Sequence, residues 1–402
     1  MKFQVDKKLT GFTIFVIILC LLNLLINNIN GRFFVSDFKV YYLAAKNLIA
    51  GGNVYFIAFG EDSGFYKYSP LTLMFFLPYT LLNLKAAAII HFCILSIAYW
   101  YSFLLIRKMF KDYFFTQVNR EGWLLSLAVI STMIFLVKEL YLGNINILLI
   151  MLLLIALTNL TSGKEWKGAV IIGLVVLTKP FFLLLILPLM LRKKFRALMI
   201  MSITILAGFL IPFLFLGINR GLALHLDWFK TVLGHSSDFP SLNSIDYLLK
   251  RYFFPGLPGY FEYFIILSGG LLSIWFIISN LRQEKKSGNE EKTGKANFIF
   301  EWFIIMAMIP NITKTDTEHF LASIPIITFI IYYISVKRKY FLSPVMVVLI
   351  FFYGANSQDL LGAEFSKRLF YMGLIGFSNL LLIVMSLILF LDWRRCDSLK
   401  LH

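Results

Sequence analysis

The chain has 402 residues, of which 59% are hydrophobic and only 15% are charged, and its mean hydropathy is +0.78. Soluble domains are about 45–50% apolar and about 25% charged, so this composition excludes a soluble globular protein. The formal net charge of +16 falls on alternate connecting segments and not in one patch. This distribution indicates membrane topology and argues against a nucleic-acid partner.

Apolar segments close to the length of a membrane-spanning helix recur from end to end. They predict an all-α polytopic membrane protein with about 12 transmembrane helices, in which residues 1–402 form a single integral membrane domain. With the N-terminus placed in the cytoplasm, the inner connecting segments hold most Lys and Arg side chains. The predicted spans are 9–29, 86–106, 123–141, 144–160, 168–178, 180–191, 197–217, 261–281, 298–311, 318–336, 340–356 and 371–392.

The first span, 9–29, is too long for a signal peptide and lacks a cleavage site of small residues, so we expect it to remain as an anchor. The first outer loop, 30–69, contains an amphipathic pattern from Ser36 to Ile49. It predicts a helix along the outer membrane surface, capped by Ser36 and with Asp37 in its first turn. The predicted apolar face comprises Phe38, Tyr41, Tyr42, Ala45, Leu48 and Ile49.

Other segments also interrupt the spans. The apolar stretch 70–82 is short, so we expect a re-entrant or partial helix. Segment 168–191 is open to two interpretations, one long span or two short spans separated by Lys179-Pro180, and the proline favours two. A second large outer loop covers 218–260. The polar stretch 282–297 predicts a mobile cytoplasmic linker.

Polar residues that the fold alone does not explain gather on the predicted outer segments. Ionisable side chains at membrane depth cost much free energy, so they mark functional sites by default. Both charged residues also have a structural explanation. Asp37 could simply stabilise the N-terminus of its helix, and Lys179 could be a lysine at a span end that snorkels to the surface. Asn144 and Asn146 could cap the next span, and His319 could be satisfied locally. The candidate residues are Asp37, Lys67, Tyr68, Asn144, Asn146, Lys179, Asn243, Asp316 and His319, whereas Lys138-Glu139 is interpreted as a local ion pair.

Several catalytic motifs are absent from the sequence. There is no glycine-rich phosphate loop, no Ser nucleophile elbow, no His-Glu-x-x-His pair and no Asp-x-Asp pair. The three cysteines, Cys20, Cys93 and Cys396, have no metal-ligand or disulfide spacing. We therefore expect no metal and no cofactor. The inner loops are too short for a nucleotide-binding domain, which argues against a cytosolic sugar nucleotide as donor.

Four short segments carry a resemblance to a known family. They are Asp37-Phe38-Lys39-Val40-Tyr41-Tyr42 with Ala44-Ala45, Tyr68-Ser69-Pro70-Leu71, Gly143-Asn144-Ile145-Asn146, and Gly173 through Leu177-Thr178-Lys179-Pro180. In this order and placement they resemble glycosyltransferase family 87, the GT-C mannosyltransferases that use polyprenyl-phosphate sugars. The family's usual Gly-Gln-x-Asn, Tyr-Pro-Pro and Asn-Gln-Ser appear here as Gly143-Asn144-Ile145-Asn146, Tyr68-Ser69-Pro70 and Leu242-Asn243-Ser244.

The resemblance implies a GT-C fold and an inverting transfer of a hexose, with mannose as the first choice. The donor would be a polyprenyl-phosphate sugar, and the acceptor a lipid or glycan on the outer face. Asp37 would be the general base, Lys179 would lie near the donor phosphate, and His319 falls in an outer turn where such proteins often carry a histidine. The other candidates would bind the donor.

Other functions stay open at this point. A lipid-linked sugar flippase or a secondary transporter would show repeat-related broken helices and polar groups near the bilayer midplane, whereas here the polar groups gather at one face. A polysaccharide polymerase or ligase would present paired arginines, and Arg220 and Arg251 are scattered. We expect a multi-pass protein of the cell membrane, in a bacterial inner membrane, with membrane lipids around it and its active site facing outward.

Overall fold

The computed structural model describes residues 9–31, 33, 35–59, 64–234, 242–258, 260–285, 290–313, 315–354 and 357–398. Within these residues the chain is built from α- and 3-10 helices, and a single isolated bridge joins Ala58 to Phe65. The prediction of an all-α protein is confirmed.

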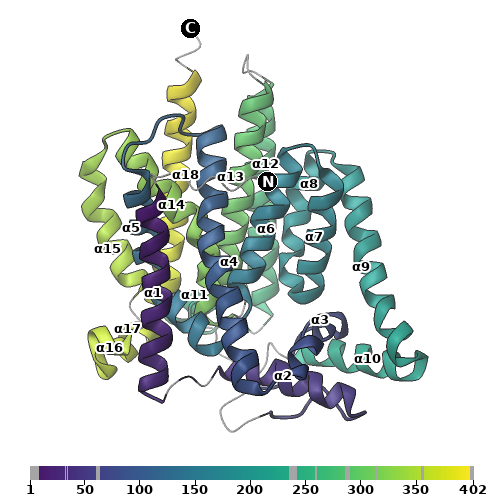
Figure 1. Ribbon diagram of the computed structural model, residues 1–402. Helices are drawn as coiled ribbons and strands as arrows, with labels where there is room; N and C mark the ends of the chain where they lie inside the picture. The colour runs from purple at the N-terminus through teal and green to yellow at the C-terminus, as the bar shows by residue number, and fades with distance from the viewer. Residues whose placement is uncertain are drawn as a thin grey trace.

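A bundle of helices runs between two ends of the molecule, and successive members run in opposite directions (Figure 1). Seven helical segments are long and apolar enough to cross a membrane. They lie in α1 (Thr10–Ile29), α4 (Leu84–Tyr113), α5 (Glu121–Leu142), α9 (Phe195–Leu216), α12 (Phe261–Glu284), η4 with α14 (Thr317–Ser323 and Ile324–Val336) and α18 (Leu374–Ser398). The chain is a multi-pass membrane protein.

Further helices complete the bundle. They are α6 (Asn146–Thr161), α7 (Glu165–Thr178), η3 with α8 (Pro180–Leu185 and Ile186–Leu191), α13 (Glu290–Ile312) and η5 with α15 (Tyr340–Leu342 and Ser343–Tyr353). A helix therefore lies over every predicted span. Twelve crossings stays a prediction, because these members do not meet the length and hydropathy of a span by themselves.

The segment from α7 to α8 is a hairpin and not one long span. Pro180 lacks an N–H and disfavours helical backbone in the residue before it, so Lys179 is extended, with φ −134° and ψ 98°. An ion pair of 2.6 Å between Glu165 and Lys194 joins the start of α7 to the segment after α8, at the open end of the hairpin. The prediction of two short segments is confirmed, and Lys179 lies at the tip between them.

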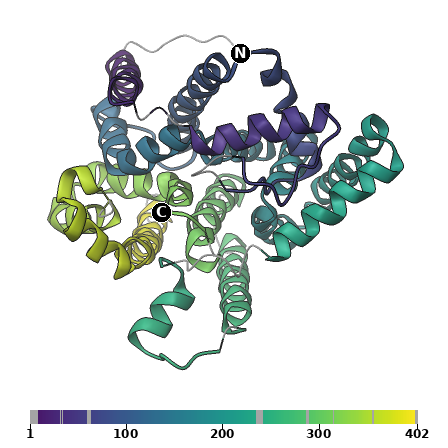
Figure 2. The same ribbon diagram turned by 90° about the horizontal axis from the view of Figure 1, so that it is seen from below.

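Two helices lie across one end of the bundle, which we call the α2 end (Figures 1 and 2). They are α2 (Ser36–Ile49), which confirms the predicted surface helix, and α10 (Ile218–Gly234). The Arg220 guanidinium of α10 donates to the Leu48 carbonyl at 2.8 Å, so α10 satisfies a carbonyl at the end of α2. The short helices α3 (Pro70–Met74), η2 (Leu77–Leu81), α11 (Ile245–Tyr252), α16 (Gln358–Leu361) and α17 (Ala363–Tyr371) complete the set.

The predicted partial helix over 70–82 is confirmed as α3 and η2, but two details predicted for α2 are wrong. Ser36 is the first helical residue and not the cap, because Val35 precedes it in the left-handed region at φ 44° and no side chain caps the helix. Ile49 is 64% exposed because the helix ends there. The rest of the predicted apolar face is buried, namely Phe38, Tyr41, Tyr42, Ala45 and Leu48.

The predicted mobile linker 282–297 is wrong at both of its ends, where the structure is helical. α12 continues to Glu284, and α13 begins at Glu290. The Asn297 side chain, fully buried in α13, donates to Glu284 Oε1 at 2.7 Å. Both residues belong to the packed bundle at the end opposite to α2, because a cation at the end of another helix neutralises the Glu284 carboxylate.

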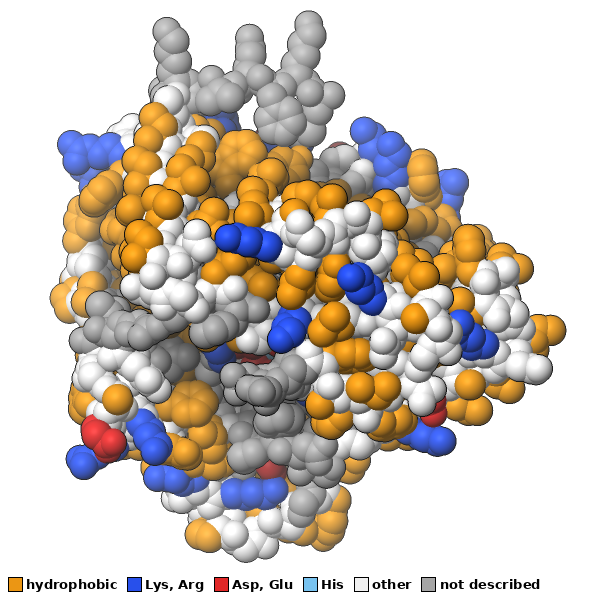
Figure 3. Space-filling model, turned by 60° about the horizontal axis from the view of Figure 1, so that its bottom comes forward, with side chains coloured by type: hydrophobic (Ala, Val, Ile, Leu, Met, Phe, Trp, Pro, Cys, Tyr) orange, Lys and Arg blue, Asp and Glu red, His pale blue; other side chains and the backbone are white. Residues whose placement is uncertain are grey.

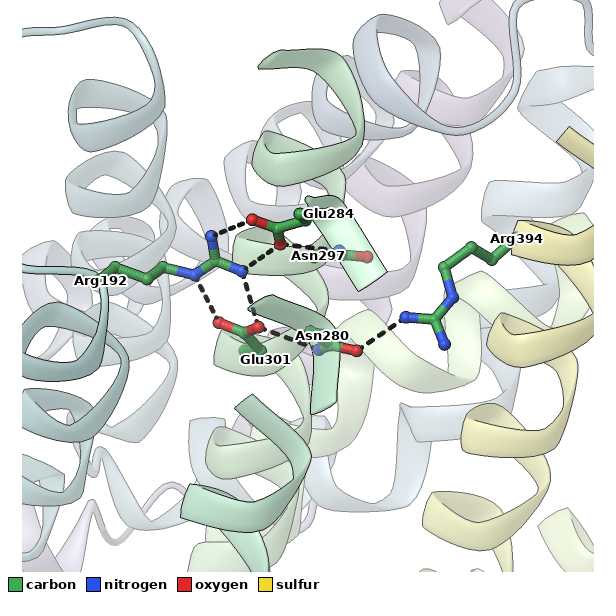
Figure 4. A network of polar contacts seen from close by, with 6 residues as sticks. All are labelled: Arg192, Asn280, Glu284, Asn297, Glu301 and Arg394. Atoms are coloured by element: carbon green, nitrogen blue, oxygen red, sulfur yellow. Dashed lines mark hydrogen bonds and ion pairs between the residues drawn. The ribbon is translucent and has the colours of Figure 1, made fainter. Parts of the chain in front are cut away.

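That cation is Arg192, at the centre of a largely buried polar network (Figure 4). Its guanidinium donates to both carboxylate oxygens of Glu301 at 2.8 Å and to both of Glu284 at 2.7 and 3.2 Å. Asn280 donates to Glu301 at 2.9 Å and accepts from Arg394 at 2.9 Å. The network joins the end of α8 to α12, α13 and α18.

Replacing Arg192 with Met is expected to lower the free energy of unfolding by about 3–5 kcal/mol, because Glu301 is fully buried and would lose its cation. Thermal unfolding of the protein in lipid nanodiscs would measure the loss. The double variant Arg192→Met, Glu301→Leu should regain part of it, since apolar side chains can replace a buried ion pair. An unchanged melting temperature in the single variant would contradict this prediction.

Candidate functional site

A tight turn between α5 and α6 brings predicted residues together at the α2 end. Gly143 ends α5 in the left-handed region, with φ 67°. A Cβ atom on Gly143 would lie 2.7 Å from Phe38 Cβ, so glycine is what allows α2 to pack this closely on the turn. Asn144 and Asn146 follow directly, and each contacts a different part of the site.

Asn144 holds the carboxylate of Asp37. Its Nδ2 donates to Asp37 Oδ2 at 2.7 Å, and its Oδ1 accepts from the Tyr68 hydroxyl at 3.2 Å. The Tyr68 hydroxyl in turn lies 3.0 Å from the Tyr41 hydroxyl. Asp37 Oδ1 accepts no hydrogen bond from any residue that the structure describes, which leaves this oxygen available to a substrate.

The position of Asp37 changes its acidity. Burial raises the pKa of Asp37 to about 6, and the negative charges of Glu318 and Asp316 act in the same direction. The Lys179 ammonium and the hydrogen bond from Asn144 act in the opposite direction. Asp37 is therefore mostly ionised at neutral pH, and its pKa is close enough to neutrality for it to take up a proton during a reaction.

Lys179 is only 5% exposed, so it does not snorkel to the surface. Its ammonium donates to Asn146 Oδ1 at 2.5 Å and to His319 Nε2 at 2.9 Å. Because Nε2 accepts, His319 carries its proton on Nδ1, which lies 3.2 Å from the Asp316 carbonyl oxygen. The Lys179 ammonium also lies 5.5 Å from the centre of the Tyr68 ring.

Two charged residues that the sequence interpretation set aside belong to the same network. Glu139 is fully buried and accepts from Asn146 Nδ2 and from the Ile147 N–H, both at 2.9 Å. It thereby satisfies a backbone donor in the first turn of α6. Lys138 pairs with Glu318 at 2.8 Å. The predicted local pair Lys138-Glu139 is wrong, because adjacent residues of a helix point about 100° apart.

We call these residues the Asp37–Lys179 cluster. Its members are Asp37, Tyr68, Lys138, Glu139, Asn144, Asn146, Lys179, Glu318 and His319. The signal that could have identified Lys138 and Glu139 is their depth, since two charges in the last turns of an apolar span need partners.

Three predicted residues are not members of the cluster. Lys67 is half-buried and precedes Tyr68 in the chain, and Asp316 is exposed beside the cluster. Asn243 lies in another network, where its Oδ1 accepts from the Gly376 N–H at 3.1 Å and its carbonyl oxygen accepts from Asn311 at 3.2 Å. Asn243 thus contacts both α13 and α18, and its predicted role in donor binding stays a prediction.

The surface at the α2 end is hydrophobic with scattered Lys and Arg side chains (Figure 3). On α10, Leu226 and Phe229 are about half exposed. Such a surface fits a membrane interface. Among the described residues, no group of three or more His, Cys, Asp and Glu side chains is arranged to hold a metal ion. In the Asp37–Lys179 cluster, Asp37 Oδ1 is available to accept a proton from a hydroxyl group. The buried Lys179 ammonium is available to bind an anion.

Comparison with known proteins agrees with this chemistry. The model of glycosyltransferase family 87 matches residues 65–289, more than half of the chain. An α-(1→3)-arabinofuranosyltransferase of Corynebacterium glutamicum is 30% identical over 248 residues, which are 58% of this chain and 53% of the relative. The chain thus spans about half the length of that relative. The family match includes Asn144 and Lys179, whereas Asp37 and His319 lie outside it. This chain belongs to glycosyltransferase family 87, a family of membrane glycosyltransferases.

Proposed function

We propose that this protein is a GT-C-type enzyme that transfers a sugar from a polyprenyl-phosphate sugar to a hydroxyl group of a lipid or glycan acceptor, with inversion. The observation that carries the proposal is the Asp37–Lys179 cluster. In it, a carboxylate with an available oxygen and a buried ammonium lie in the same cluster of contacts at the α2 end. Family membership supports glycosyl transfer as the reaction.

In the proposed reaction Asp37 takes the proton of the acceptor hydroxyl through Oδ1. The acceptor oxygen attacks the anomeric carbon from the side opposite to the phosphate. The new C–O bond forms as the bond from the anomeric carbon to the phosphate oxygen breaks, which inverts the configuration. Polyprenyl phosphate leaves as an anion, and the Lys179 ammonium stabilises its charge. Asn144 fixes the Asp37 carboxylate, and Asn146 fixes Lys179.

The remaining predicted residues complete the proposed donor site. Tyr68 contacts both halves of the cluster, through its hydroxyl to Asn144 and through its ring to Lys179. Lys67 and Asp316 border it, and we propose them as contacts of the donor headgroup. His319, neutral and with Nε2 directed at Lys179, adds no positive charge of its own.

We place the reaction on the outer face of a bacterial inner membrane. Basic side chains gather at the end of the bundle opposite to the α2 end, as expected for a cytoplasmic face. They include Arg107, Lys108, Lys111, Arg120, Arg192, Lys193, Lys194, Arg196, Arg338 and Lys339.

For the sugar we propose a hexose, with mannose as the first donor to test. The printed name of the relative contains arabinofuranose, a five-carbon sugar, which makes polyprenyl-phosphate arabinofuranose the second donor to test. The two sugars differ in ring size, so one panel of donors separates them.

The test is transfer by the purified protein in lipid nanodiscs, with radiolabelled polyprenyl-phosphate sugars and an extract of lipid and glycan acceptors. Transfer from one donor, with an inverted linkage in the product, would support the proposal. Retention at the anomeric carbon would contradict the proposed mechanism. No transfer from any donor, together with movement of a lipid-linked sugar across liposomes, would favour a flippase instead.

The pH dependence of transfer follows from the acidity of Asp37. The reaction needs the ionised carboxylate, and burial raises the pKa of Asp37 to about 6. We expect kcat/KM to fall about tenfold per pH unit below that pH. This fall in rate at acid pH should persist in His319→Gln, which removes the histidine of the cluster and keeps Asp37. Loss of the fall in that variant would assign it to His319.

A further inference from the structure

A cavity of about 540 Å³ lies at the basic end of the bundle, far along the spans from the Asp37–Lys179 cluster. It is formed where α5 begins and α14 ends. Its inner wall is apolar and includes Leu124 and Ile334, whereas its rim is polar and includes Gln117 and Asn119. A cavity with this division suits a ligand that is itself part polar and part apolar.

The rim carries an uncompensated positive charge. Arg120 and Arg338 line the cavity, and no lining residue is a carboxylate. Neither guanidinium has a hydrogen-bond or ion-pair partner among the residues that the structure describes. In the Arg192 network at the same end, by contrast, each guanidinium is bound to a carboxylate or an amide. An arginine fork without a partner is a ready site for a phosphate group.

Two aromatic side chains place the cavity at the membrane interface. Trp123 and Tyr340 line it and are 61% and 60% exposed. Exposed Trp and Tyr at the ends of spans typically lie at the level of lipid headgroups. The positive charge that sets membrane topology can lie at any position on this end of the protein. It requires neither a cavity nor an aromatic pair, so topology alone does not account for the arrangement.

We propose that this cavity binds an anionic phospholipid, with the phosphate between Arg120 and Arg338 and the start of an acyl chain against the apolar wall. Basic pockets between spans are suited to such headgroups because the phosphate is held by charge and the glycerol and acyl groups by apolar contact. The site is separate from the proposed transfer reaction and does not depend on it.

Trp123 provides a reporter for the test. Wild-type protein and Trp123→Phe are each placed in two kinds of phosphatidylcholine bilayer. One contains a small fraction of brominated phosphatidylglycerol and the other the same fraction of brominated phosphatidylcholine. In both lipids the bromine lies near the carbonyl end of an acyl chain. Bromine quenches tryptophan on contact, and the difference between the two proteins isolates Trp123 from the other tryptophans. We expect the site to bind brominated phosphatidylglycerol on the order of tenfold more tightly than brominated phosphatidylcholine, since each arginine near the surface raises the affinity for an anionic lipid several-fold.

Charge variants decide between a site and a general surface effect. The preference should be lost in Arg120→Gln, Arg338→Gln and kept in Lys193→Gln, Arg196→Gln, which removes the same charge from exposed positions at the α8–α9 turn. Equal quenching by the two lipids, or equal loss in both double variants, would overturn the proposal. Displacement by inorganic phosphate at constant ionic strength would assign the site to a soluble anion and would also overturn it.

Discussion

Asp37→Asn is expected to slow sugar transfer about 10²- to 10⁴-fold, the range that a positioned general base contributes. The substitution removes the proton acceptor and little else. Asn144 donates to Asp37 Oδ2 in the wild type, and the amide oxygen of an asparagine can accept the same hydrogen bond. The helix and its buried face do not depend on the charge. Transfer from the preferred donor at saturating acceptor would measure the loss in kcat.

The matched control is Asp227→Asn on α10. Asp227 is a carboxylate at the same end of the molecule, 41% exposed and 3.9 Å from Lys230, so its substitution should leave the rate within about twofold. The residual activity of Asp37→Asn should also lack the fall in rate at acid pH. Wild-type rates in a folded Asp37→Asn protein that still binds donor would end the assignment of Asp37 as the base.

Local patterns predicted the part of the site that lies within one helix. The sequence from Ser36 to Leu48 places apolar side chains on one face of a helix whatever the rest of the chain does, and Asp37 falls in its first turn. Lys179 was also predictable, because a lysine followed by proline interrupts an apolar run and therefore breaks the helix.

Contacts between distant segments could not be read in the same way. Asp37 and Asn144 are 107 positions apart, and Lys179 and His319 are 140 apart. The partner of each polar group depends on how the spans pack, which hydrophobic periodicity does not encode. Lys138 and Glu139 were paired with each other for this reason, although each binds a group on another segment.

The mistaken linker has the same cause. Residues such as Glu284 and Asn297 give this stretch the composition of a solvated segment, and the local sequence does not show which group binds their side chains. Arg192, 92 positions before Glu284, provides the charge that allows this stretch to pack as helix. Local composition therefore underestimates order wherever a distant cation satisfies buried carboxylates.

Lys179→Met is expected to lower kcat about 10²- to 10³-fold, the cost of removing one charged donor from a developing anion. Methionine has nearly the length of the lysine stem, so the buried position stays filled. The ammonium uses two of its three N–H groups on Asn146 and His319, and no described residue accepts the third. We infer that this third donor meets the phosphate, whose negative charge grows as the bond to the sugar breaks.

The control for this variant is Lys46→Met on α2, an exposed ammonium 5.0 Å above the Tyr42 ring, which should leave transfer within about twofold. Donor leaving-group strength separates charge stabilisation from a structural effect. If Lys179 stabilises the departing phosphate, donors with a more acidic leaving group should regain rate in Lys179→Met and gain little in wild type. Equal gains in both proteins would show that Lys179 only holds the fold around Asn146 and His319.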